Sequence, residues 1–225
     1  MRLAIRVDAV KTLTKEIKSL AEFLIEKKIP ATYALIPGQF DHEVAEFFLA
    51  ILREHPRLVA VVPYGWLGKN YGTASEPGEF GSFRSRIEQW EDIKRSTEKM
   101  DRVFMHRWSR VFVLPSGGAD KNTDDLLRQA SYKAVSGRYR PSPKRLIADL
   151  GASMRIKSPK LAKEIVSEAK FLLNAREAII LAVEQSALAG VYLDEMKKTM
   201  TVLAAQGVKQ VLLGDLAGIS LEKVI

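Results

Sequence analysis

Unbroken apolar runs that alternate with segments of helical periodicity are the feature that most constrains how this chain folds. Residues 58–62 and 178–183 are apolar at every position. A strand of this kind is covered on both faces, which is typical of a parallel sheet between layers of helices. Elsewhere, as at Leu13, Ile17 and Leu20, apolar residues recur at the spacing of a helix face. Because the two kinds of segment alternate from end to end, the sequence predicts an α/β fold.

The succession of segments predicts seven or eight strands, at residues 3–7, 31–36, 58–62, 111–114, 132–136, 145–149, 178–183 and 209–213. Helices are expected near residues 13–25, 42–54, 83–104, 122–130, 161–173 and 192–206, with Asp41, and Asn122 or Thr123, as N-caps and Gly207 as a C-cap. A (β/α) barrel, complete or with one unit distorted or missing, is the first choice. An open doubly wound sheet is the second, since periodicity does not separate them. No linker or repeat divides the chain, so residues 1–225 are expected to form one domain.

Composition narrows the class of protein. The chain is 47% hydrophobic and 28% charged, as in an ordinary globular protein, and neither a membrane span nor a membrane partner is expected. It has no cysteine, which excludes disulfides and Cys nucleophiles. No basic-then-apolar leader precedes the first strand, so a cytoplasmic location is expected. The net charge of +8 comes from Lys and Arg spread along helices without interleaved aromatic residues, so no nucleic-acid partner is expected.

The most distinctive loop is PYGWLGKNYG at residues 63–72, which is followed by Glu79-Phe80-Gly81 and by Arg84. It follows the apolar run at 58–62, so it lies at the carboxyl end of that strand, where α/β proteins place their chemistry. This pattern resembles the H-G-W-x-H-x-N segment of the polysaccharide deacetylase family (NodB-homology, carbohydrate-esterase-like), which has Glu-Phe-Gly and Arg downstream at similar spacing. The resemblance extends weakly over nearly the whole chain and implies a deacetylase-like β/α barrel.

The resemblance also implies where a metal would be bound, because the two His of the family segment hold a divalent ion such as zinc. Tyr64 and Gly68 occupy their places in this chain. A tyrosine can be an oxygen ligand only when it is deprotonated, and glycine offers only its backbone. The three histidines of the chain, His42, His55 and His106, follow no predicted strand and have no ligand spacing. Neither a metal site of the family type nor another cofactor is therefore expected.

The first strand ends in Arg6-Val7-Asp8-Ala9. Relatives whose loop reads H-G-W-x-H carry R-D-D-D-A here, where one Asp is the general base and the next binds metal. Aligning Arg6 with that Arg places Asp8 on the base position and Ala9 on the metal-binding one, and a shift by one residue would exchange the roles. The resemblance thus implies Asp8 as a catalytic base. The residues alone are equally consistent with Asp8 capping the next turn or pairing with Arg6.

Two further strand ends carry candidate groups. Residues 181–186, LAVEQS, resemble the family's G-L-L-T-H-H, where His assists departure of the leaving group; Glu184 and Gln185 stand at or beside those His. Glu184 is a candidate catalytic acid if burial raises its pKa, and otherwise a polar strand end. Residues 114–118 match the family's P-P-W-N-R only in position and in Pro115. They are predicted to form a turn, either one whose backbone N–H groups bind an anion or one without a binding role.

Loss of the metal ligands would remove most of the family's chemistry. A bound metal lowers the pKa of water from about 15.7 to about 7, which makes hydroxide easier to form by on the order of 10 kcal/mol. We therefore expect a protein that binds a small polar molecule or carbohydrate in the former active-site cleft. An active deacetylase or esterase with Asp8 as base is the alternative, and a protein-binding scaffold is a third class. The aromatic residues of the loop could instead simply pack beneath it. The predicted ligand-binding residues are Arg6, Tyr64, Trp66, Asn70 and Arg84.

Overall fold

The computed structural model describes residues 1–137, 147–151 and 153–218. Its larger sheet contains parallel strands in the order β3-β2-β1-β8-β7, and β9 pairs with the first residues of β1. Every strand pair recorded in this sheet is parallel, as the unbroken apolar runs predict. The strands are β1 (Arg2–Val10), β2 (Ala31–Leu35), β3 (Val59–Pro63), β7 (Met154–Ile156), β8 (Ala178–Glu184) and β9 (Lys209–Val211).

A second, smaller sheet is also parallel. Its strand order is β4 (Val111–Val113), β5 (Ala134–Ser136) and β6 (Ala148–Leu150). A bridge between Tyr64 and Val113 joins the two sheets, and the Gly65 N–H donates to the Val113 carbonyl at 3.0 Å. Within the described ranges no strand pairing connects β6 to β7. The architecture is therefore a distorted (β/α) barrel, open on one side, which confirms the predicted fold class.

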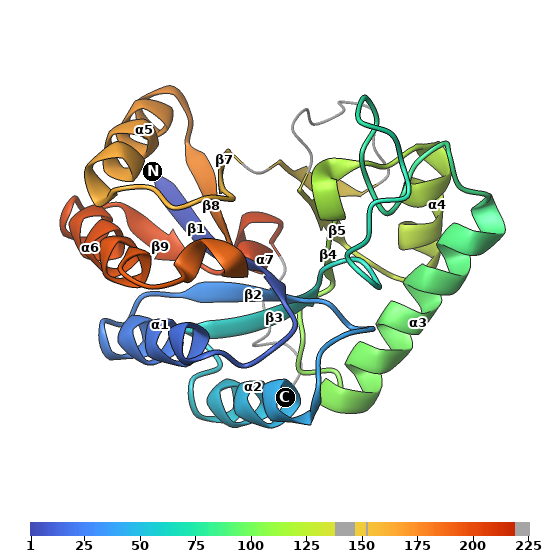
Figure 1. Cartoon of the computed structure of the whole chain (residues 1–225), viewed down its shortest axis with the longest axis horizontal. Helices are drawn as coiled ribbons and strands as arrows, with labels where there is room; N and C mark the ends of the chain where they lie inside the picture. Colours follow the sequence, from blue (N-terminus) through green and yellow to red (C-terminus); the bar gives the residue numbers. More distant parts are fainter. Residues whose placement is uncertain (138–146, 152, 219–225) are drawn as a thin grey trace.

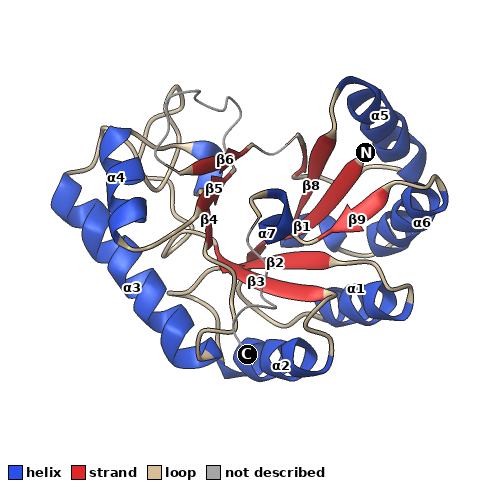
Figure 2. Cartoon of the chain, turned by 180° about the vertical axis from the view of Figure 1, so that it is seen from behind, coloured by secondary structure: helices blue, strands red, loops and turns tan. Residues whose placement is uncertain are grey.

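Helices surround the strands (Figure 1). α1, α2, α5 and α6 lie around the larger sheet, and α3 and α4 lie beside the smaller one (Figure 2). Short α7 lies next to β1, and the N–H of its Leu213 donates to the hydroxyl of Thr32 on β2 at 3.0 Å. The helices are α1 (Lys15–Glu26), α2 (His42–Glu54), α3 (Arg86–Phe104), α4 (Lys121–Gln129), α5 (Ala162–Ala175), α6 (Tyr192–Ala205) and α7 (Leu213–Leu216), with 3-10 turns at Pro115–Gly117 and Gln185–Leu188. Among the described residues, no helix is both long and apolar enough to cross a membrane.

Local capping explains where the helices begin. Asp41 caps α2 as predicted, accepting a hydrogen bond from the Val44 N–H at 3.0 Å. α3 begins later than expected, because Ser85 and Glu88 form a capping box. The predicted cap of α4 was wrong. Asp120 is its N-cap and accepts from the Thr123 N–H at 2.8 Å.

Two short strands differ from the expectation. The strand predicted at 145–149 is β6, two residues of the prediction lying outside the described part of the chain. β7 was not predicted at all, because the alternation in its three residues, Met-Arg-Ile, is too short to indicate a strand. It nevertheless lies in the sheet, because Met154 and Ile156 pair in register with Leu181 and Val183 of β8.

The apolar core has two parts. The outer part lies between strands and helices and contains most large side chains, such as Phe48, Phe104 and Phe112. The inner part fills the barrel interior, mostly with alanine, valine and other aliphatic residues. Its members are Ala4, Ala34, Ile36, Val62, Tyr64, Val111, Val113, Ala134, Ile180, Val211 and Leu213. This inner cluster lies next to the polar residues at the carboxyl ends of the strands.

Candidate functional site

The strand register brings the predicted residues of three strands to one edge. Asp8 at the end of β1 is in register with Glu184 at the end of β8. On the other side of β1, β2 and β3 run parallel to it, so that Tyr64, which follows β3, lies at the same carboxyl edge. The charges of Asp8 and Glu184 both raise the pKa of Tyr64, as expected for groups that lie close together. The candidate site is therefore assembled at this edge.

A buried ion pair holds the centre of the site. The Arg6 guanidinium binds Asp8 with both ends, at 2.5 Å from Nε to Oδ1 and 2.7 Å from Nη2 to Oδ2. Nη1 donates to the Ser136 hydroxyl on β5 at 2.5 Å, and Ser136 donates to the Leu150 carbonyl on β6. Arg6 is fully buried and Asp8 is 4% exposed. Of the alternatives open for Asp8, the pairing with Arg6 is thus the one that the fold adopts.

A second arginine lies in the same row of the barrel. Arg155 on β7 is in register with Ala182 on β8, which is in register with Arg6 on β1. The charge of Arg155 lowers the pKa of both Tyr64 and Glu184, so it faces the candidate site. Sequence reasoning missed Arg155 because it missed β7. The only signal was an arginine flanked by two apolar residues.

Burial sets the protonation of the two remaining groups. It raises the pKa of Tyr64 well above its usual range, and the charges of Asp8 and Glu184 raise it further, so the phenol stays neutral and can donate a hydrogen bond. Burial also raises the pKa of Glu184, and Lys157, whose Nζ is 3.8 Å from Oε1, opposes that rise. The site can therefore offer a neutral phenol beside a half-buried carboxyl group.

The loop after β3 is held by a glutamate whose part the sequence did not reveal. Glu79 is fully buried and accepts three backbone hydrogen bonds, from the N–H groups of Trp66 (3.1 Å), Leu67 (2.6 Å) and Gly68 (3.0 Å). Burial raises its pKa from 4.5 to about 7, although these three bonds act in the opposite direction. Its position in the Glu-Phe-Gly motif was the only sign of a special role.

The other predicted ligand-binding residues lie in the same loop rather than beside Asp8. Asn70 Oδ1 accepts from the N–H groups of Gly72 at 3.1 Å and Gly78 at 2.7 Å. Arg84 donates to Asp92 at 2.7 Å and to the Glu79 carbonyl at 3.0 Å. These contacts shape the loop, and contact of Asn70 or Arg84 with a ligand stays a prediction.

Trp66 lies against the turn that follows β2. Its carbonyl accepts from the Gly38 N–H at 2.8 Å, and its half-buried ring lies against Gly38. A Cβ at Gly38 would be 3.0 Å from Trp66 Cε2, so glycine is needed for this close approach. The structure thus brings Arg6, Asp8, Tyr64 and Glu184 together and places Trp66 above the neighbouring strand.

The residues that the loop resemblance assigns to metal binding do not fit a divalent ion. Both oxygens of Asp8 are bound by Arg6, Ala9 has no ligand atom in its side chain, and the phenol of Tyr64 stays protonated. Gly68 has a φ of +65° and donates its N–H to Glu79. In the described part of the chain, no three His, Cys, Asp or Glu residues gather in a way that could hold a metal ion.

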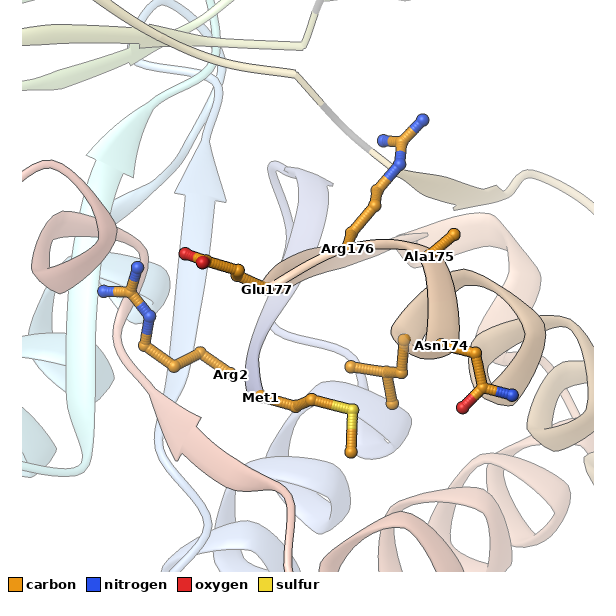
Figure 3. Close-up of a pocket in the computed structure, with 7 residues that line it drawn as sticks. Met1, Arg2, Asn174, Ala175, Arg176 and Glu177 are labelled. Atoms are coloured by element: carbon orange, nitrogen blue, oxygen red, sulfur yellow. The ribbon is translucent and has the colours of Figure 1, made fainter.

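A pocket at the opposite end of the barrel offers no comparable chemistry. It measures about 660 Å³ and lies at the amino ends of β1 and β8, where its lining includes Met1, Arg2 and Glu177. Figure 3 shows Arg2 and Arg176 turned away from each other, with Glu177 extending to the same side as Arg2. Polar groups from several strand ends come together at the carboxyl edge, which remains the candidate site.

The raised pKa of Glu79 predicts a pH dependence of stability. Because its pKa is about 7 in the fold and about 4.5 when unfolded, the folded state binds more protons between these values. The contribution of Glu79 is therefore fully present below pH 4.5 and is lost as the pH rises through 7, by on the order of 3 kcal/mol. Urea unfolding of the wild type and of Glu79→Gln across this range should diverge by that amount. Parallel profiles would contradict the prediction.

Comparison with protein-family models found no match, and comparison with curated proteins found none either. Solved structures do match. A candidate polysaccharide deacetylase from Mycobacterium smegmatis is 12% identical, with a TM-score of 0.70 over 96% of this chain and 89% of that one. The Xyl-CE4 domain of a multidomain xylanase from the hindgut metagenome of Trinervitermes trinervoides is 10% identical, with a TM-score of 0.67 over 96% and 88%.

A family 4 acetyl xylan esterase from Clostridium thermocellum, in complex with a cobalt ion, is 9% identical, with a TM-score of 0.64 over 96% of this chain and 90% of that one. Similarity at this level of identity concerns the fold, and it covers nearly the full length of both chains. This chain therefore has the fold of the polysaccharide deacetylases and family 4 carbohydrate esterases, which confirms the fold that its loop motif implied.

Proposed function

We propose that this chain binds a small polar or carbohydrate ligand at the carboxyl edge of its barrel and has lost metal-dependent hydrolysis. The buried pair of Arg6 with Asp8 carries this proposal. The carboxylate at the position of the catalytic base has both oxygens bound to a guanidinium. An acceptor that is already bound in this way is poorly placed to take a proton from water.

The size of the missing effect supports the loss of hydrolysis. A metal that lowers the pKa of water from about 15.7 to about 7 supplies on the order of 10 kcal/mol. A general base contributes only about 10²- to 10⁴-fold in rate. Since the side chains at the metal positions do not fit a divalent ion, the base alone would have to carry the reaction.

The remaining groups suit recognition of a polar ring. A sugar needs an apolar face beside a few polar anchors. Tyr64 offers a neutral hydroxyl, Glu184 a half-buried carboxyl and Trp66 a half-buried indole. Among the proteins of the same fold, a family 4 carbohydrate esterase from Streptomyces lividans is in complex with acetate.

A single domain over residues 1–225 and a cytoplasmic location belong to the same proposal.

Calorimetric titration with N-acetylglucosamine oligomers and acetylated xylo-oligosaccharides tests ligand binding. We expect saturable binding that is unchanged after treatment with EDTA, and Trp66→Ala should weaken it about tenfold or more, because stacking on an aromatic face is lost. Trp90→Ala is the matched control. Trp90 is also half-buried, but it belongs to α3 and packs against the outer part of the core. Equal weakening by the two variants, or one tightly held metal ion per chain by elemental analysis, would refute the proposal.

A hydrolase with Asp8 as base and Glu184 as acid is the second candidate. Burial of Glu184 favours it, because a raised pKa is what a proton donor needs near neutral pH. Chitooligosaccharides, acetylated sugars and aryl acetates are the substrates to screen. Turnover that survives EDTA but disappears in Asp8→Asn would establish this candidate. Binding without turnover would establish the first.

A further inference from the structure

The segment after β3 forms a concave row of backbone donors that the protein fills with its own carboxylate. The N–H groups of Trp66, Leu67 and Gly68 all point at Glu79, at 2.6–3.1 Å. Successive N–H groups arranged in this way form an anion-binding nest, which prefers a charged acceptor. Because Glu79 is fully buried, no water molecule can replace it without a change in conformation.

Two glycines show how closely the carboxylate is fitted to this row. Gly65 has a φ of +60°, and a Cβ on it would be 1.9 Å from Glu79 Oε2. Gly68 has a φ of +65°, and a Cβ on it would be 2.9 Å from Ile36 Cδ1. The backbone of residues 65–68 is therefore shaped around Glu79 on one side and the end of β2 on the other.

We infer that Glu79 is a positioning residue whose negative charge fixes residues 65–68 and thereby holds Tyr64 and Trp66 over the candidate site. Tyr64 directly precedes the fixed segment, and Trp66 donates one of the three hydrogen bonds. A carboxylate has lone pairs for all three N–H groups, whereas the amide in a Glu79→Gln variant would present N–H donors to at least one of them. Replacing the carboxylate by an amide thus removes at least one of the three bonds and loosens the segment.

The surroundings of Glu79 set its pKa. On the loop side it faces only backbone N–H groups. From α3, Asp92 raises the pKa of Glu79, and Asp92 is itself paired with Arg84, which also donates to the Glu79 carbonyl. From the turn at Pro115–Gly117, Pro115 contributes apolar atoms near Gly65. Burial is the largest influence and raises the pKa to about 7.

Amide hydrogen exchange of the protein without any ligand tests the inference. At pH 8 we expect the protection of residues 66–68, corrected for intrinsic exchange rates, to be about tenfold lower in Glu79→Gln than in the wild type, which is the effect of losing about one hydrogen bond to a charged group. The reason is that the amide presents a donor to the row of donors. Amides within β1 are the internal reference and should not change.

Glu76→Gln is the matched control, because Glu76 lies in the same loop but is exposed and accepts only from Ser82. It should keep the wild-type protection of residues 66–68. Equal protection of residues 66–68 in Glu79→Gln and wild type at pH 8 would overturn the inference. So would a loss of protection that extends to β1, which indicates a general structural role. If Glu79→Gln does not fold, Glu79→Asp is measured instead, because its shorter side chain cannot reach all three N–H groups, and wild-type protection in that variant refutes the inference.

The consequence for ligand binding rests on the proposed function, whereas the exchange measurement does not. If residues 66–68 lose protection in Glu79→Gln as expected but no saccharide binds, the proposed function fails and the positioning role stands. If saccharides bind and the segment does not respond, the proposed function stands without Glu79. The two ideas are therefore tested separately.

Discussion

Arg6→Met should lower the free energy of unfolding by about 3–5 kcal/mol, the effect of leaving a buried charge without its partner. Asp8 is only 4% exposed, and Arg6 supplies both of the side-chain hydrogen bonds that neutralise it. Methionine has a similar length but no charge, so the variant isolates the loss of the guanidinium. Urea unfolding at pH 7 measures the change.

Two further variants show whether the charge is responsible. Combining Arg6→Met with Asp8→Leu should recover most of the loss, because a buried ion pair can be replaced by apolar residues at little net change. Lys94→Met should change stability by less than about 0.5 kcal/mol, since the pair of Lys94 with Glu98 is exposed at the surface of α3. A double variant that is less stable than Arg6→Met alone would contradict this explanation.

Gly65→Ala should destabilise the protein by about 3 kcal/mol or more. Alanine at a φ of +60° costs about 1–2 kcal/mol. Its Cβ would also be 1.9 Å from Glu79 Oε2 and 2.6 Å from Pro115 Cγ. The carboxylate must therefore move away from its donors, and hydrogen bonds to a charged group contribute about 1.5–3 kcal/mol. Thermal and urea unfolding should both show the loss.

Gly190→Ala separates the two causes. Gly190 has a φ of +63°, but a Cβ there would meet nothing within 4 Å, so only the cost of the backbone conformation remains. We expect Gly190→Ala to lose about 1–2 kcal/mol. If the two variants lose the same amount, the carboxylate of Glu79 is not held by the geometry of Gly65.

Much of the fold followed from local patterns. The unbroken apolar runs predicted parallel strands, and the alternation of strands and helices predicted a barrel or, as second choice, an open sheet. β7 could not be predicted, because three residues give no period and the strand is defined by its pairing with β8. The cap of α4 was misplaced because Asp120 and Thr123 both have side chains that cap helices, and only their positions in the first turn distinguish them.

The sequence by itself determined that Asp8, Tyr64 and Glu184 end parallel strands, and parallel strands present their carboxyl ends at one edge. The loop resemblance implied that Tyr64 and Gly68 stand where the family has histidines. Only the tertiary structure decided that Arg6 binds Asp8 and that Glu79 holds the loop. The choice between solvent, a helix cap and a buried partner depends on which groups lose water together, and chain folding brings such groups together from distant positions.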